Sequence, residues 1–85
     1  MATVTPMIRI DLHSAVPSYR QLAAILGARI RSGELAAGEA LPSITALAQE
    51  TGLAVTTVRR AISLLIDEGL AHTVPGRATY AGPRG

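Results

Sequence analysis

The stretch LAQETGLAVTTVRRAI, residues 47–62, decides the fold. A short helix leads to Gly52, where a glycine readily takes the left-handed conformation that ends a helix. A longer helix then begins near Val55 or Thr56 and runs to Glu68. One face of this second helix carries the apolar residues at helical spacing: Val58, Ala61, Ile62 and Leu65. A short helix, a glycine turn and a longer helix predict a helix-turn-helix.

The segments on either side predict a winged form of this motif. Upstream, Ser43 is a favourable N-cap for the short helix, and an earlier helix begins at about Pro17 and ends at Gly33. Downstream, a Pro-Gly turn at residues 75–76 joins two short strands. The N-terminal segment MIRIDL, residues 7–12, alternates apolar and polar residues, which predicts a strand that pairs with this hairpin.

The expected fold class is therefore mainly α with a small β-sheet (α+β). It is a winged helix-turn-helix with three helices, a C-terminal β-hairpin wing and a short N-terminal strand. The chain has 85 residues, too few for two independent cores, and its 48% hydrophobic content is enough for one. We expect a single domain over residues 7–82, with flexible tails at residues 1–6 and 83–85.

Several classes of protein are excluded by composition. There is no cysteine, so disulfides and thiolate metal sites are absent. The N-terminus lacks the basic region and apolar run of a secretory signal. No stretch approaches the roughly 18–20 apolar residues that cross a bilayer. We therefore expect a cytoplasmic protein without a membrane partner.

The positive charge of the chain comes from arginine alone. There are eight arginines, no lysine and a formal net charge of +2. Residues 1–52 carry no net charge, so the whole excess lies in residues 53–85, which hold the longer helix and the hairpin. The planar guanidinium of arginine suits phosphate and guanine. GC-rich coding also favours arginine over lysine, so this composition alone does not identify a partner.

The arrangement of polar residues on the longer helix favours DNA as the partner. With its apolar face inward, the residues that point outward are Thr56, Arg59, Arg60 and Ser63. Thr57 lies on the flank of the first turn, where N–H groups favour a nearby phosphate. Arg59 is placed to reach guanine edges or a phosphate. Arg77, at the tip of the hairpin turn, is placed to reach the DNA backbone or the minor groove.

Four motifs, in order and at matching spacing, resemble the GntR family of bacterial transcription regulators. They are IRID…VPSYRQL, IRSGELAAGEALPS, LAQETGLAVTTVRRAI and DEGLAHTVPGRATY, which together cover Ile8 to Ala81. The resemblance implies that Thr56, Thr57 and Arg59 contact DNA from the recognition helix. It also implies wing contacts from Gly76 and Arg77, and a position near the backbone for Ser43.

The chain departs from the family pattern at several positions. The family usually has Ser-Arg where this chain has Ala54-Val55, and an acidic residue followed by arginine where it has Ile44-Thr45. Thr45 and Val55 therefore stand where two arginine contacts are expected. The methyl groups of Val55 suit contact with a thymine methyl. Arg60, where the family often has glutamate, restores part of the lost charge. Ala78 replaces a glycine that is common in the wing.

The remaining polar residues do not favour an enzyme, a metal site or a cofactor. His13 and His72 have no partner at ligand spacing, and the serines have no His–carboxylate arrangement around them. No Gly-rich phosphate-binding loop is present, since GELAAG lacks the lysine of such a loop. His13 and His72 are therefore expected to be structural or solvated.

The sequence as a whole predicts a sequence-specific transcription regulator, a repressor, that binds double-stranded DNA. We expect a homodimer on a palindromic operator, since one small module buries limited surface. We expect no small-molecule effector within this chain, although full-length family members usually carry a C-terminal domain that senses ligands and dimerises. Two alternatives stay open: a winged-helix protein-interaction adaptor, and an architectural DNA binder with no sequence preference.

Overall fold

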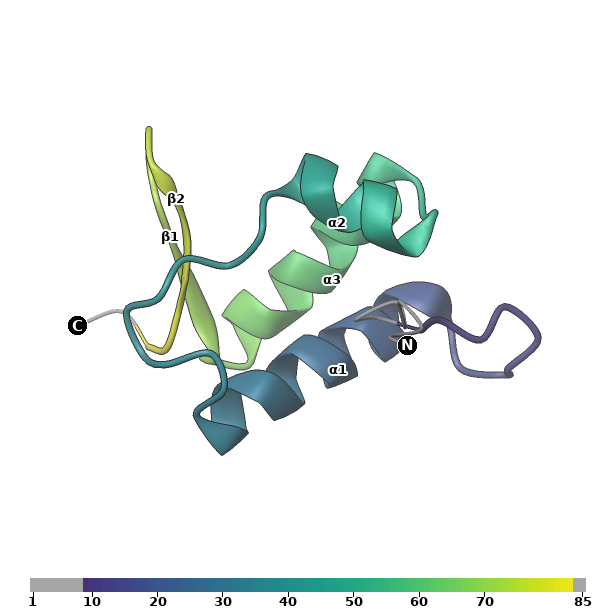
Figure 1. Ribbon diagram of the computed structural model, residues 1–85, viewed down its shortest axis with the longest axis horizontal. Helices are drawn as coiled ribbons and strands as arrows, with labels where there is room; N and C mark the ends of the chain where they lie inside the picture. The colour runs from purple at the N-terminus through teal and green to yellow at the C-terminus, as the bar shows by residue number, and fades with distance from the viewer. Residues whose placement is uncertain (1–8, 84–85) are drawn as a thin grey trace, which may run out of the picture.

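The computed structural model describes residues 9–83, in which three helices are followed by a β-hairpin. The helices are α1 (Ser18–Ser32), α2 (Ile44–Thr51) and α3 (Val55–Asp67), and the strands are β1 (Ala71–Val74) and β2 (Ala78–Ala81). α3 lies between the other two helices, and the hairpin stands beside its C-terminal end (Figure 1). No helix in the described part of the chain is long and apolar enough to cross a membrane.

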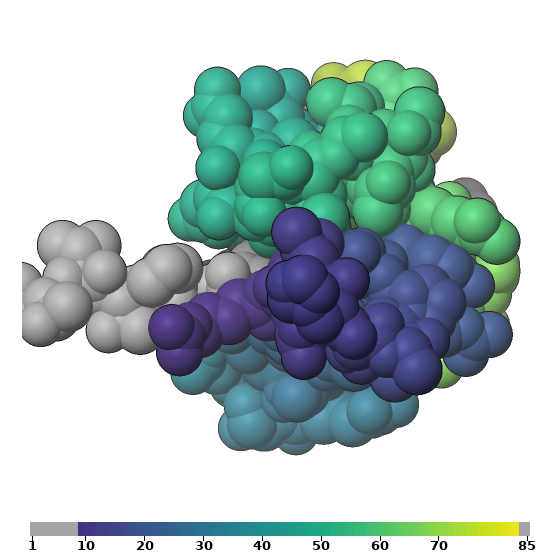
Figure 2. Space-filling model, turned by 90° about the vertical axis from the view of Figure 1, so that its right-hand side faces the viewer, coloured from purple at the N-terminus to yellow at the C-terminus, as the bar shows by residue number. Residues whose placement is uncertain are grey.

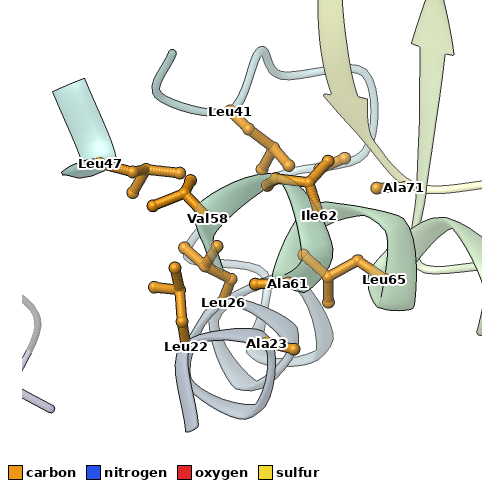
Figure 3. Close-up of a cluster of buried hydrophobic side chains, with 11 residues drawn as sticks. Leu22, Ala23, Leu26, Leu41, Leu47, Val58, Ala61, Ile62, Leu65 and Ala71 are labelled. Carbon is orange, nitrogen blue, oxygen red and sulfur yellow. The ribbon is translucent and has the colours of Figure 1, made fainter. Parts of the chain in front are cut away.

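The core lies where α3 packs on α1 and α2, and it is built from small and branched aliphatic side chains (Figure 3). The face of α3 predicted to point inward is buried, at Val58, Ala61, Ile62 and Leu65. Gly27 of α1 faces this core, where an added Cβ would lie 3.3 Å from Leu70 Cδ1 and 3.6 Å from Leu65 Cδ2. The missing side chain therefore leaves room for two leucines, which lets α1 pack closely against the end of α3.

Local interactions fix α2 and the turn that follows it, and the sequence predicted two of them, the Ser43 cap and the end of the helix at Gly52. The hydroxyl of Ser43 accepts a hydrogen bond from the Ala46 N–H at 3.0 Å and caps α2. Gly52 ends α2 in the left-handed region, with φ of 75°. The Thr51 hydroxyl donates to the Leu47 carbonyl at 2.7 Å and accepts from the Leu53 N–H at 3.1 Å. These bonds set the direction in which α3 leaves the turn.

The hairpin is a two-stranded antiparallel sheet in which Ala71 pairs with Ala81 and Val74 with Ala78. The other edge of β2 is covered by the connection between α1 and α2. Ala40 forms a β-bridge with Tyr80, and the Leu41 N–H donates to the Thr79 carbonyl at 2.9 Å. This connection joins the hairpin to the helices.

The prediction of an N-terminal strand is wrong for the residues that the structure describes. Residues 9–12 belong to no strand, while residues 7–8 of that prediction and the tail at 1–6 lie outside the described part. The Asp11 side chain accepts the N–H of His13 at 2.9 Å and starts a turn, which leaves Leu12 72% exposed. The Gln21 side chain binds the backbone N–H and carbonyl of Asp11, each at 2.8 Å.

The place beside the hairpin expected for that strand is taken by residues 38–41. The segment before α1, which includes residues 9–12, instead lies across the start of α1, as the purple segment in Figure 2 shows. Among the described residues 9–12, Ile10 keeps the expected apolar role, since it packs against the core. The Gln21 side-chain amide holds the loop before α1, because it donates to the carbonyls of Asp11 and Val16.

Candidate nucleic-acid interface

The outward face of α3 presents polar and cationic side chains to solvent. Thr56, Arg59, Arg60 and Ser63 are exposed, and Thr57 is half-buried on the flank. Val55 is 42% exposed at the first position of the helix. Because the opposite face is buried, α3 holds this row of side chains in a fixed orientation. Hydroxyls and a guanidinium in such a row are suited to base edges and phosphates.

The start of α3 leaves backbone donors available. Its N-cap residue, Ala54, has no side chain that could accept the first N–H groups. No acidic residue occupies the first turn either. Uncapped N–H groups and the positive end of the helix dipole favour an anion such as phosphate. The hydroxyls of Thr56 and Thr57 lie in the same turn and can donate to the same anion.

The start of α2 and the hairpin turn lie on two sides of one groove. The groove has a volume of about 440 Å³, and among the residues that line it are Ser43, Thr45, Gly76 and Arg77. Ile62 of α3 also lines it. The groove thus brings together predicted site residues from α2 and from the hairpin turn. The predicted site residues of α3, from Val55 to Arg60, do not line the groove.

The hairpin turn leaves Arg77 exposed to solvent. Gly76 has a φ of 76°, and the Arg77 N–H donates to the Val74 carbonyl at 3.0 Å to close the turn. Arg77 itself is exposed. It therefore combines exposure to solvent with a place at the groove beside the start of α2.

Arg60 is placed differently from Arg59, although the two are adjacent on α3. Its guanidinium carbon lies 4.3 Å from the ring centroid of Tyr19 in α1. Arg20 also lies near this ring, with its guanidinium carbon at 5.8 Å. Tyr19 itself is half-buried and packs against the core, so its ring joins the core of the domain to Arg60.

The two histidines lie apart from this surface and show no arrangement suited to a metal. His72 stacks on Tyr80 with ring centroids 5.9 Å apart, and its Nδ1 is 2.9 Å from the Gly82 carbonyl oxygen. His13 is exposed in the loop before α1. Among residues 9–83, no group of three or more His, Cys, Asp or Glu side chains could hold a metal ion.

Ser43 has two possible roles that substitution can separate. Ser43→Ala removes the N-cap, and we expect a loss of about 1 kcal/mol in the free energy of unfolding. Ser43→Asp keeps an oxygen cap but brings a negative charge to the start of α2. We expect Ser43→Asp to keep close to wild-type stability in chemical denaturation and to bind duplex DNA more weakly than Ser43→Ala. Equal DNA affinity of the two variants would place Ser43 away from the phosphates.

Comparison with known proteins identifies the family to which this arrangement belongs. The profile of bacterial regulatory proteins of the gntR family matches residues 9–81. The transcriptional repressor NagR of Bacillus subtilis is 37% identical over 73 residues, which cover 86% of this chain and 30% of NagR. The chain therefore spans less than a third of that relative.

Two solved structures share the fold. The GntR-family transcription factor YtrA from Sulfolobus acidocaldarius superimposes with a TM-score of 0.82 at 38% identity, covering 93% of this chain and 83% of YtrA. The DNA-binding domain of AraR, in complex with its operator ORE1, superimposes with a TM-score of 0.77 at 28% identity, covering 85% of this chain and 90% of that domain. The chain belongs to the gntR family of bacterial regulatory proteins and has the winged helix-turn-helix fold of that family's DNA-binding domains.

Proposed function

We propose that this domain binds double-stranded DNA sequence-specifically and represses transcription. α3 enters the major groove, and the turn at residues 75–77 lies over the adjacent backbone or minor groove. The observation that carries this proposal is the two-sided character of α3, which is buried at Val58 and Leu65 and exposed at Thr56 and Arg59. The likeness to the AraR domain, which was solved in complex with an operator, supports DNA as the partner.

The proposed contacts divide into two kinds. Val55, Thr56 and Arg59 lie at or near the start of α3, the part of a recognition helix that reaches base edges. Around them, the positioning contacts to phosphates come from Ser43, Thr45, Thr57, Arg60, Gly76 and Arg77. Phosphate contacts fix the register of the domain on the duplex, and base contacts select the sequence.

We further propose that two copies act together on a two-fold symmetric operator in the cytoplasm, where the bacterial chromosome lies. The described residues span 38 × 31 × 23 Å. Such a module buries limited surface on DNA, and a second copy on a symmetric half-site raises both affinity and specificity. On this proposal the domain acts by binding alone, without a catalytic step, a cofactor or a small-molecule effector.

Equilibrium binding to unrelated duplexes over a range of salt concentrations tests this function against its alternatives. A DNA-binding domain loses affinity as salt rises, with a slope of about −0.9 in log K against log salt for each phosphate contact. Binding that is absent at low salt would favour a protein-interaction adaptor. Salt-dependent binding of equal strength to every duplex would favour an architectural protein.

Val55 provides a test of base reading at the first position of α3. It is exposed, so Val55→Arg should fold normally, and it introduces a guanidinium that can bind guanine in a bidentate manner. We expect the base preference at one operator position to change toward guanine by about 1–3 kcal/mol, which is roughly five- to 150-fold in relative Kd. Competition between duplexes that differ at that position measures the change. An unchanged preference would show that position 55 does not face a base.

A further inference from the structure

We propose that Tyr19, Arg20 and Arg60 form a phosphate clamp, in which the Tyr19 ring orients two guanidinium groups toward the DNA backbone on the α1 side of the recognition helix. The inference rests on the DNA-binding function proposed above. It assigns new roles to Tyr19 and Arg20, and it assigns Arg60 to the backbone and not to the bases.

The first observation is the shared ring. Both guanidinium carbons lie within about 6 Å of the Tyr19 centroid, the range of a cation–π interaction, and Arg60 at 4.3 Å is the closer. Tyr19 is half-buried against the core, whereas Arg20 and Arg60 are exposed. The ring is therefore the fixed part, and it limits the directions that the two arginines can take.

The second observation is that this positive charge is not neutralised within the described part of the chain. Arg29, in the last turns of α1, forms an ion pair with Glu34 at 3.2 Å, and this pair involves neither Arg20 nor Arg60. Glu68 lines the same groove between α1 and α3 as Arg20, but no ion pair links the two. Two guanidinium groups beside one ring, neither of them in an ion pair within residues 9–83, are therefore available to an anion such as phosphate.

The chemistry of the contact favours phosphate as this anion. A guanidinium that stacks on a ring uses its flat face, so the N–H donors around its edge stay available. Those donors match the oxygens of a phosphate in a bidentate manner. Base edges are less suitable partners for Arg60, because its side chain is turned toward α1 and away from the outward row of Thr56 and Arg59.

The position on the fold agrees with a backbone contact. Successive residues of a helix are rotated by about 100°, so Arg60 lies on the flank of α3 next to Arg59. α1 packs along that flank, and Figure 2 shows the start of α1 below the adjoining ends of α2 and α3. A helix about 10–12 Å wide fills a major groove about 12 Å wide, so residues on its flank lie near the phosphates at the rim.

Binding of a pool of random-sequence duplexes by single variants tests the clamp, because phosphate contacts do not depend on sequence. We expect Arg20→Gln and Arg60→Gln each to weaken binding about three- to tenfold at about 0.1 M salt, and to reduce the salt slope by about 0.9. Arg31→Gln removes the same charge from the far end of α1 and is the matched control. It should leave both the affinity and the slope close to wild type.

Variants of Tyr19 separate positioning from folding. Tyr19→Phe keeps the ring and should bind as the wild type does. Tyr19→Leu keeps an apolar side chain but removes the ring, and should weaken binding by a factor similar to that of Arg60→Gln. The loss of affinity in the double variant Tyr19→Leu/Arg60→Gln should be smaller than the product of the two single-variant losses, because both changes disrupt the same contact. Thermal unfolding of each variant confirms that the domain is folded at the temperature of the assay.

Unchanged salt slopes for Arg20→Gln and Arg60→Gln would overturn the clamp. Losses of DNA affinity in these two variants that are no larger than the loss in Arg31→Gln would also overturn it. A change of base preference in Arg60→Gln would make Arg60 a base-reading residue and would also overturn it. In each of these cases the wild type still binds DNA with a steep salt dependence, so the proposed function stands. A wild type that binds no duplex would overturn the proposed function and the clamp together.

Discussion

Replacing Arg59 by glutamine weakens binding to the preferred duplex by about 1–3 kcal/mol, or roughly five- to 150-fold in Kd, and relaxes the base preference at one operator position. Arg59 is the exposed arginine on the outward face of α3 that does not stack on Tyr19. Its guanidinium is therefore available for a bidentate contact to guanine. Glutamine keeps a long polar side chain and favours the helix, so the fold should be unaffected.

Competition binding against duplexes with a single altered base pair measures this effect. Arg31→Gln again provides the control, since it removes the same charge from an exposed position of α1. The loss for Arg59→Gln should be largest on the preferred duplex and small on unrelated ones. A uniform loss on all duplexes would assign Arg59 to a phosphate, and no loss on any duplex would remove it from the interface.

The second large effect concerns the core that orients α3. Leu65 is fully buried at its contact with α1, and Leu65→Ala should lower the free energy of unfolding by about 3 kcal/mol, since such truncations cost about 2–5 kcal/mol. The whole free energy of unfolding of a domain of this length is about 4–13 kcal/mol. We expect the melting temperature to fall by about 15 °C, and DNA binding to be lost wherever the variant is unfolded.

The neighbouring residue supplies the control for this prediction. Ile66 lies on the same helix but is 37% exposed, and Ile66→Ala should change the free energy of unfolding by less than about 1 kcal/mol. Thermal and denaturant unfolding followed by circular dichroism measure both variants. Similar losses for Leu65→Ala and Ile66→Ala would contradict the assignment of the inward face of α3.

The helix-turn-helix could be predicted from the sequence because its determinants are local. The inward face of α3 follows from helical spacing alone, and the ends of α1 and α2 follow from Gly33 and Gly52. Both glycines have positive φ angles, as their positions required. The exposure of Thr56 and Arg59 then follows from geometry, since the opposite face is buried. The roles of these residues on DNA stay predictions.

Other features depend on contacts between residues far apart in the chain, which spacing does not reveal. The alternation in residues 7–12 is typical of a strand, but the Asp11 turn and the Gln21 hydrogen bonds give residues 9–12 another course. Residues 38–41 begin with a glycine at positive φ, which is typical of a turn, yet they pair with β2. The contact between Tyr19 and Arg60 likewise joins α1 to α3.

Selection of bound duplexes from a random DNA pool, followed by sequencing, tests the central claim most directly. The domain should enrich a two-fold symmetric motif, and the same selection with Arg59→Gln should lose the preference at one position of each half-site. A single enriched half-site would retain sequence-specific reading but remove the proposed dimer. No enriched sequence, with binding that still weakens as salt rises, would contradict the account of α3 as a base-reading helix.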